Sequence, residues 1–320
     1  MKKLVIGIDI GGTNTIFGFV DKTGNTLWEG GIPTKGYPNV EDYLVALASA
    51  IKANLAIIPD SKSYEIVGVG IGAPNGNYYK GTIEEAPNLE WKGIVPIINL
   101  FKRHFDVPMI LTNDANAAAM GEYLFGAAKG LRDFIVITLG TGLGSGIFVN
   151  GDLVYGHDGH AGELGHLIVN PNGRQCGCGR RGCLETYVSA TGIKRTVFKL
   201  LADTMYPSEL RSICFDNLTA EMIFQAAKKG DKIALMAFEY TGNMLGRKLA
   251  DAVTVTSPKA IFIFGGLAKS GKLIMEPTQK AMEDNLLGIF KNKVKVMPSG
   301  LLDRNVAVLG AAALVWKQLE

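Results

Sequence analysis

Short apolar runs that end in loop-forming residues recur along the first part of the chain. They span residues 4–8, 66–71 and 107–111. Runs of this length, bounded by Gly, Asn or Asp, are typical of buried strands. Residues 40–57 and 115–125 instead carry the spacing of helices. The alternation of buried strands with helices predicts an α/β fold.

The opening pattern returns in the second half of the chain. A strand, a glycine-rich loop and a hairpin are expected at residues 4–8, 9–15 and 16–28, and again at 134–139, 140–146 and 147–155. The two copies lie about 130 residues apart. The repetition predicts two similar α/β domains, each with a loop suited to phosphate. Two such loops would hold a nucleotide in a cleft between the domains.

The rest of the chain completes this two-domain plan. Residues 186–252 are mostly helical by period, residues 260–264 read as a strand, and residues 306–318 as a helix that packs back on the first domain. We place a small α/β domain at residues 1–114 plus about 301–320, and a large α/β domain at residues 115–300.

Length and composition set the class of protein. A chain of 320 residues is long for one core, and 47% hydrophobic with 20% charged residues is typical of a globular protein. The net charge of +3 indicates no nucleic-acid partner. The apolar run at 4–8 is too short for a signal peptide or a membrane span. We therefore expect a cytoplasmic protein without a membrane partner.

The first loop, Asp9-Ile10-Gly11-Gly12-Thr13, has the chemistry of a phosphate site. Glycine lets backbone N–H groups approach a phosphate, and the Asp9 carboxylate could hold Mg²⁺ through water. One glycine pair after a strand is equally typical of a tight turn. The second loop, which contains Thr141 and Gly142, favours the nucleotide interpretation.

A third glycine-rich segment partly matches the P-loop motif of nucleotide-binding proteins. Gly266 to Lys272 fits G-x-x-x-x-G-K, but Leu273 follows where a P-loop requires Ser or Thr for the metal. We interpret Gly265 and Gly266 either as a surface against the adenosine part of a nucleotide or as a turn at a strand end.

Asp114 is the candidate general base. It lies between an expected strand and an expected helix, where open α/β sheets place their ligands. A kinase that acts on an alcohol needs such a base near the attacking hydroxyl. Asp114 could instead be only the N-cap of helix 115–125, and Asn113 could bind a sugar hydroxyl or merely cap.

Three of the four cysteines fall within eight residues and follow a histidine. His166, Cys176, Cys178 and Cys183 form a donor set that suits a tetrahedral structural zinc in the loop 166–183. Free thiols beside an unrelated histidine are the alternative. Cys214 lies apart and is expected to be a buried thiol. Glu163 and Glu185 flank the loop, either as contacts for vicinal sugar hydroxyls or as solvated surface groups.

Six motifs in one order resemble the ROK family of sugar kinases, repressors and open reading frames, which has the actin-like ATPase (ribonuclease H-like) fold. They are Asp9-Ile10-Gly11-Gly12-Thr13, Ala86-Pro87-Asn88-Leu89, Asn113-Asp114-Ala115-Asn116-Ala117, Leu139-Gly140-Thr141-Gly142, Gly162-Glu163-Leu164-Gly165-His166 and Cys176-Gly177-Cys178-Gly179-x-x-Gly182-Cys183-Leu184-Glu185. Together they cover almost the whole chain.

The resemblance implies a role for each matching residue. Asp114 matches the general base for the sugar 6-hydroxyl. The sugar contacts would be Asn88, Asn113, Glu163, His166 and Glu185, and His166 would also bind zinc. The nucleotide side would comprise Asp9, Gly11, Gly12, Thr13, Thr141, Gly142, Gly265 and Gly266. The implied activity is ATP-dependent phosphorylation of a hexose, with glucose leading, Mg²⁺ and zinc as cofactors, and a homodimer as the assembly.

Two departures from the family pattern affect the site. Many members carry Lys at the position of Asn14, so a phosphate contact there is not implied. Many carry Gly after Ala-Pro where this chain has Asn75, and that loop borders the sugar. The preferred hexose therefore stays open among glucose, fructose, allose, N-acetylglucosamine and N-acetylmannosamine, as does the donor between ATP and polyphosphate.

Two other classes are weighed against the kinase. A sugar-sensing repressor of the family would carry a helix-turn-helix segment before the first domain, and only eight residues precede Asp9. An actin-like chaperone or filament ATPase is disfavoured by the expected zinc loop and by the Asn113-Asp114 pair. The kinase remains the prediction.

Overall fold

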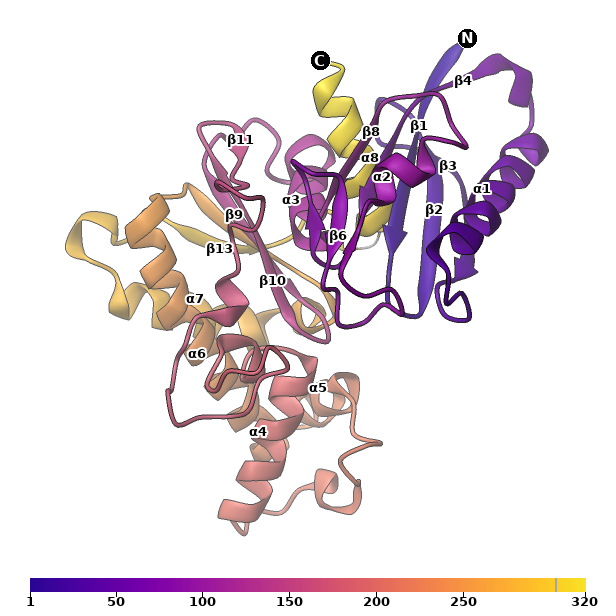
Figure 1. Ribbon diagram of the computed structural model, residues 1–320. Helices are drawn as coiled ribbons and strands as arrows, with labels where there is room; N and C mark the ends of the chain where they lie inside the picture. The colour runs from indigo at the N-terminus through magenta and orange to yellow at the C-terminus, as the bar shows by residue number, and fades with distance from the viewer. Residues whose placement is uncertain (303) are drawn as a thin grey trace. The chain divides into compact units, whose positions relative to one another are not determined.

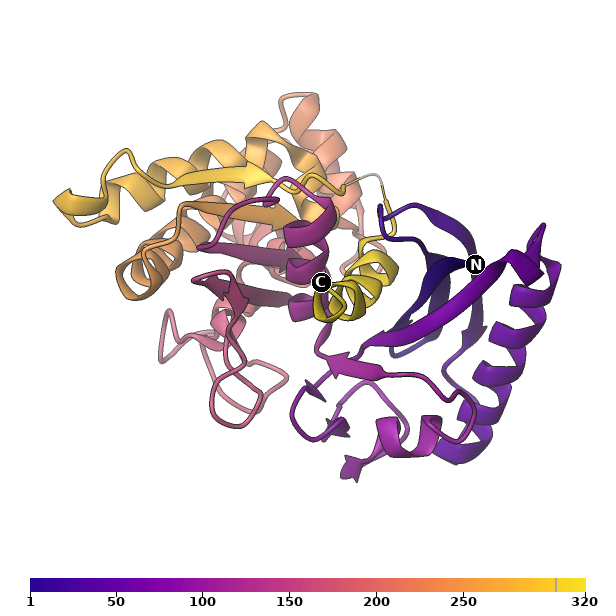
Figure 2. The same ribbon diagram turned by 90° about the horizontal axis from the view of Figure 1, so that it is seen from above.

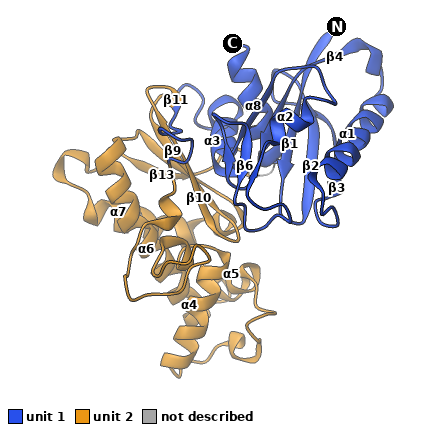
Figure 3. Ribbon diagram, in the orientation of Figure 1, with its two compact units in different colours: residues 1–130, 153–161, 303–320 blue, residues 131–152, 162–302 orange. Residues whose placement is uncertain are grey.

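A computed structural model describes residues 1–302 and 304–320. The described chain divides into two compact units (Figure 3). Unit 1 comprises residues 1–130, 153–161 and the C-terminal residues up to 320, and unit 2 comprises residues 131–152 and 162–302.

Unit 1 is built on a five-stranded sheet in the order β3-β2-β1-β4-β8 (Figure 1). Strands β1 to β3 pair antiparallel, whereas β1, β4 and β8 are parallel. The strands are β1 (Lys2–Ile10), β2 (Asn14–Val20), β3 (Thr26–Pro33), β4 (Tyr64–Gly72) and β8 (Met109–Thr112). A second, three-stranded sheet contains β5 (Gly76–Asn77), β6 (Thr82–Glu84) and β7 (Ile94–Val95). The helices are α1 (Val40–Ile57), α2 (Ile97–Phe101), α3 (Asp114–Phe125) and α8 (Val306–Gln318).

Helix α8 packs directly on the backbone of strands β1 and β4 and lies beside α3 (Figures 1 and 2). Gly7 and Gly70 are neighbours in the sheet register. A Cβ atom on Gly70 would lie 1.8 Å from the carbonyl oxygen of Ala311, and one on Gly7 would lie 2.1 Å from that of Val308. The contact therefore requires glycine at both positions, because a side chain would hold the helix off the sheet. The expectation that helix 306–318 packs back on the first domain is confirmed.

Unit 2 repeats the topology of the first sheet, in the order β11-β10-β9-β12-β13. Strands β9 and β10 are antiparallel, and β9, β12 and β13 are parallel. The strands are β9 (Phe134–Leu139), β10 (Leu143–Val149), β11 (Asp152–Leu153), β12 (Ala260–Phe264) and β13 (Lys295–Pro298). The helices are α4 (Ala190–Asp203), α5 (Ala220–Lys228), α6 (Lys232–Thr256) and α7 (Lys272–Asn285). Short 3₁₀ helices include η2 (Leu164–His166), η3 (Leu184–Thr186) and η5 (Gly266–Ser270).

The α/β fold and its internal repeat are confirmed, with three differences in detail. The glycine loop expected at 140–146 is shorter, because β10 already begins at Leu143 and pairs with Leu139. The segment 186–252 is interrupted between α4 and α5. Helix α3 groups with unit 1, because it packs against α8, whereas the expected large domain began at residue 115. The expected domain ranges thus remain a prediction that differs from the compact units.

Within the described residues, no helix combines the length and apolar character needed to cross a membrane.

Candidate active site and metal centre

The carboxyl ends of three parallel strands bring the candidate residues of unit 1 to one edge of its sheet. Asp9 of β1 pairs with Gly72 of β4, and Gly72 pairs with Thr112 of β8. Asn113 and Asp114 follow Thr112 directly. This edge is where open α/β sheets bind their ligands. The glycine loop after β1 and the candidate base therefore lie at the same end of unit 1.

The loop between β1 and β2 is a tight turn closed by the backbone. The Gly11 N–H donates to the Asn14 carbonyl at 3.0 Å. A Cβ atom on Gly12 would lie 2.8 Å from both the Cβ and the carbonyl oxygen of Asn88. The glycine pair therefore lets the phosphate loop lie against the segment that carries a candidate sugar contact. Thr13 is exposed. Asn14 closes the turn through its backbone carbonyl, which accepts the hydrogen bond from Gly11.

Asp114 is not the N-cap of its helix. The cap of α3 is Asn113, whose side-chain oxygen accepts a hydrogen bond from the N–H of Asn116 at 2.7 Å. Asp114 is the first helical residue, and its carboxylate accepts from the N–H of Ala115 at 2.8 Å. The alternative that Asp114 serves only as the cap is wrong, because Asn113 already fills that position. The cap uses only the oxygen of Asn113, which leaves its amide group for another partner.

The two carboxyl groups at this edge hold their protons more tightly than usual. Loss of hydration raises the pKa of Asp9 to about 6, and the negative charge of Asp114 adds to the rise. Asp114 reaches solvent, yet crowding by surrounding protein atoms raises the pKa of its carboxyl as well, against the hydrogen bond from Ala115. A carboxylate with a raised pKa is a stronger base near neutral pH.

The raised pKa of Asp9 predicts pH-dependent nucleotide binding. Magnesium nucleotide would bind the ionised form, so its Kd should rise about tenfold for each pH unit below about 6 and level off above it. The sign follows from a folded-state pKa above the usual 3.8, because protonation then competes with the metal. Calorimetric titration with a non-hydrolysable ATP analogue between pH 5 and 8 measures this dependence.

Asp114→Asn supplies the control for that titration. Removing the charge of Asp114 removes one cause of the rise, so the midpoint should move to lower pH. A Kd that is flat over the whole range in both proteins would contradict a role for Asp9 at the metal.

The glycine loop of unit 2, which contains Thr141 and Gly142, and the Gly265 turn share one edge of the unit 2 sheet, because β9 and β12 are adjacent and parallel. The Gly140 N–H donates to the Gly142 carbonyl at 3.1 Å, and Thr141 between them is exposed. Gly265 has a φ of 105°, and a Cβ atom on it would lie 2.4 Å from the Leu139 carbonyl. Gly265 is thus required for a turn against the end of β9. Gly266 is exposed and starts η5.

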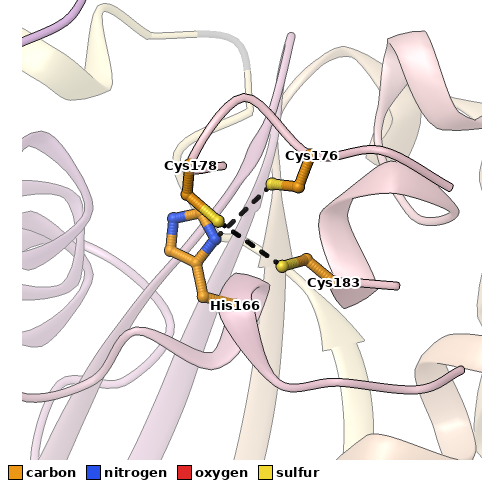
Figure 4. A group of neighbouring side chains, drawn as sticks. All are labelled: His166, Cys176, Cys178 and Cys183. Atoms are coloured by element: carbon orange, nitrogen blue, oxygen red, sulfur yellow. Dashed lines mark hydrogen bonds between the residues drawn. The ribbon is translucent and has the colours of Figure 1, made fainter. Parts of the chain in front are cut away.

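Four side chains of unit 2 converge as the sequence predicted for a metal (Figure 4). The donor atoms of His166, Cys176, Cys178 and Cys183 all lie within 4.8 Å of one another. The sulfur atoms of Cys178 and Cys183 are 3.7 Å apart, and Cys176 Sγ is 3.9 Å from His166 Nδ1. Tetrahedral zinc with bonds of about 2.3 Å places its sulfur ligands about 3.8 Å apart. The donor set and its spacing therefore fit zinc.

All four cysteines are free thiols, but Cys214 is exposed rather than buried as expected. It lies between α4 and α5, just after a short 3₁₀ helix, η4 (Glu209–Ser212). It lies outside the group of four.

Glu185 links the candidate metal centre to the start of β10. One carboxylate oxygen lies 3.1 Å from Cys176 Sγ and 3.9 Å from His166 Nδ1, while the other accepts from the N–H of Leu143 at 3.4 Å. Glu163 is exposed immediately before η2, which carries His166. Of the candidate sugar contacts in unit 2, His166 belongs to the group of four donors and Glu185 contacts it, whereas Asn88 and Asn113 belong to unit 1.

Arg174 is a supporting residue that the sequence did not reveal. Its guanidinium donates to the carbonyls of Thr186 and Gly192 at 2.7 and 2.9 Å and to the hydroxyl of Thr196 at 3.0 Å. It also lies 4.4 Å from the centre of the Tyr187 ring. These contacts tie the metal loop to α4. No pattern marks such an arginine, because its partners are mostly backbone atoms.

Comparison with known proteins places these features in a family. The profile of the ROK family matches residues 5–318. A glucokinase of Streptomyces coelicolor is 36% identical over 97% of both chains, and a glucokinase of Thermotoga maritima is 33% identical over 100% of this chain and 99% of its own. The crystal structure of a ROK family glucokinase from Streptomyces griseus with glucose and AMPPNP superimposes with a TM-score of 0.80, at 34% identity, over 97% of this chain and 98% of that one. The chain therefore belongs to the ROK family.

Proposed function

We propose that the protein is an ATP-dependent hexokinase that phosphorylates the 6-hydroxyl of glucose. The observation that carries the proposal is the carboxylate of Asp114, which has a raised pKa and is not used as a helix cap because Asn113 fills that position. It lies at the same edge of the unit 1 sheet as Asp9. Similarity to two glucokinases and to a structure that holds glucose and AMPPNP supports the choice of substrates.

Asp114 would accept the proton of the 6-hydroxyl as that oxygen attacks the γ-phosphorus. The bond from phosphorus to the bridging oxygen then breaks, and ADP leaves with the electron pair. Asp9 would hold Mg²⁺ through water, and the backbone of Gly11 and Gly12 would approach the phosphates. Phosphoryl transfer depends mainly on such positioning and charge stabilisation, and the base contributes about 10²–10⁴ in rate.

The candidate sugar contacts are those that the family resemblance implies. Asn88 and Asn113 present amide groups from unit 1, and Glu163, His166 and Glu185 present acceptors and an imidazole from unit 2. A pocket that hydrogen-bonds each hydroxyl rejects a sugar that lacks one far more strongly than an apolar pocket could. Glucose is the proposed substrate, and another hexose of the family range is the alternative.

Zinc bound by His166 and the three cysteines would order the metal loop rather than take part in chemistry, because four protein ligands leave no open position. The metal would thereby fix η2 and η3, which carry His166 and Glu185. We include a homodimer in the proposal on the basis of the family resemblance alone.

A coupled assay with a panel of hexoses and donors tests the proposal. The expected result is ATP-dependent formation of glucose 6-phosphate, with lower kcat/KM for fructose, allose and the N-acetylhexosamines. Turnover of polyphosphate in place of ATP would overturn the donor assignment. Sugar binding without turnover of any hexose would instead favour a sugar-sensing regulator, the other class within the family.

A further inference from the structure

The segment that carries Asn88 is held by side chains on both sides. It runs between β6 and β7, and Ala86 and Leu89 on either side of Asn88 are buried, with exposed fractions of 1% and 3%. Asn88 itself is exposed. An exposed side chain between buried neighbours is expected of a residue that binds a ligand rather than one that packs in the core.

Lys92 holds this segment from its C-terminal side. Its ammonium group donates to three backbone carbonyls, those of Leu89, Ala86 and Pro87, at 2.7, 3.3 and 3.3 Å. An ammonium group has three donors, so three carbonyls satisfy it completely. The three carbonyls enclose the backbone of Asn88, so Lys92 fixes the turn on which that side chain stands.

Asn75 holds the same segment from its N-terminal side. Its side-chain amide donates to the carbonyls of Glu84 and Glu85 at 2.9 and 3.2 Å, and its own carbonyl accepts from the N–H of Glu84 at 3.2 Å. Asn75 has a φ of 51°, in the left-handed region that asparagine tolerates better than most residues. Its conformation and its side chain therefore both serve this contact.

We propose that Lys92 and Asn75 are positioning residues for the hexose site. This inference rests on the proposed function, because Asn88 is a sugar contact only under that proposal. Through five side-chain hydrogen bonds to the backbone of residues 84–89, the pair keeps Asn88 in its binding position before the sugar arrives. A segment that is ordered in advance loses less conformational entropy on binding, which lowers the KM of the sugar.

Two single substitutions test the pair. Lys92→Met keeps most of the apolar stem and removes the donors. Asn75→Gly removes the amide while accepting the same positive φ, so it adds no backbone strain. Each should raise the KM of the hexose about tenfold, the loss expected for one or two net hydrogen bonds. The kcat and the KM of ATP should stay within about threefold, because neither residue touches the reacting atoms.

Further variants distinguish the loss of positioning from the loss of a positive charge and from the loss of the Asn88 side chain itself. Lys129→Met removes an exposed lysine of the same unit and should change nothing. Lys92→Arg should behave like Lys92→Met, because a planar guanidinium cannot direct its donors at three converging carbonyls. Asn88→Ala sets the full effect of losing the presented side chain, and the two positioning variants should not exceed it.

Hydrogen exchange of the free protein gives a readout that does not depend on activity. Amide exchange across residues 84–93 should be faster in Lys92→Met and Asn75→Gly than in Lys129→Met. Unchanged exchange would overturn the inference even if glucose is phosphorylated. Faster exchange without a rise in the hexose KM would also overturn the positioning role. Failure of the unmodified protein to phosphorylate any hexose would refute the proposed function, and the exchange data would still report whether the two side chains hold the segment.

Discussion

Asp114→Asn is expected to lower kcat by at least about 100-fold while the Kd of glucose changes only a few-fold. The amide is the same size as the carboxylate and can still accept from the N–H of Ala115, so the start of α3 is preserved. It cannot take the proton of the sugar hydroxyl. Steady-state kinetics and calorimetric glucose binding measure the two effects separately.

Asp106→Asn is a matched control, since Asp106 is an exposed acid of the same unit, outside the sheet edge. It should leave both quantities unchanged. In the unmodified protein, kcat should also fall as the pH falls through the raised pKa of Asp114, because only the ionised form accepts a proton. Near-normal turnover by Asp114→Asn would show that another group is the base.

Loss of the metal centre has the second large expected effect, this time on stability. Cys183→Ser should abolish the single zinc expected per chain and lower the free energy of unfolding by several kcal/mol, because binding of a structural metal contributes directly to folding. Cys183 is fully buried, with an exposed fraction of 0%, so the site cannot recruit water in its place without local unfolding. Elemental analysis and thermal unfolding with and without a chelator measure the loss.

Cys214→Ser is the control, because Cys214 is exposed and lies outside the group of four donors. It should retain zinc and its melting temperature. A purified protein that contains no zinc, or a Cys183→Ser variant as stable as the control, would rule out the structural metal.

The sequence predicted those features that depend on neighbours along the chain. The repeat of strand, glycine loop and hairpin is visible because each copy is continuous, and it appears as two sheets of the same topology. The group of four donor side chains was predicted because His166 and the three cysteines lie within one short stretch, and the structure brings these side chains together. The helix at 306–318 was predicted by its period, and its packing on the first sheet was confirmed.

The features that the sequence did not reveal depend on the backbone conformation at a helix start or on side chains that bind backbone carbonyl groups. The capping role of Asn113 turns on one dihedral angle, so Asn113 and Asp114 could not be distinguished as caps by residue type alone. Lys92, Asn75 and Arg174 all bind carbonyl groups, which every residue possesses, so no pattern identifies their partners. The expected domain boundary at residue 114 differs from the end of unit 1 for a related reason, since α3 joins that unit through its contact with α8.

The contact of α8 with Gly7 and Gly70 has a consequence for synthesis on the ribosome. Strand β1 is made first, but the helix that covers it is made last, nearly 300 residues later. At a synthesis rate of about 5–20 residues per second, roughly 15–60 s would pass between the synthesis of β1 and that of α8. Its apolar strands would be open to chaperones during that time, and a stop codon shortly before residue 306 would leave the N-terminal sheet without the helix that buries it.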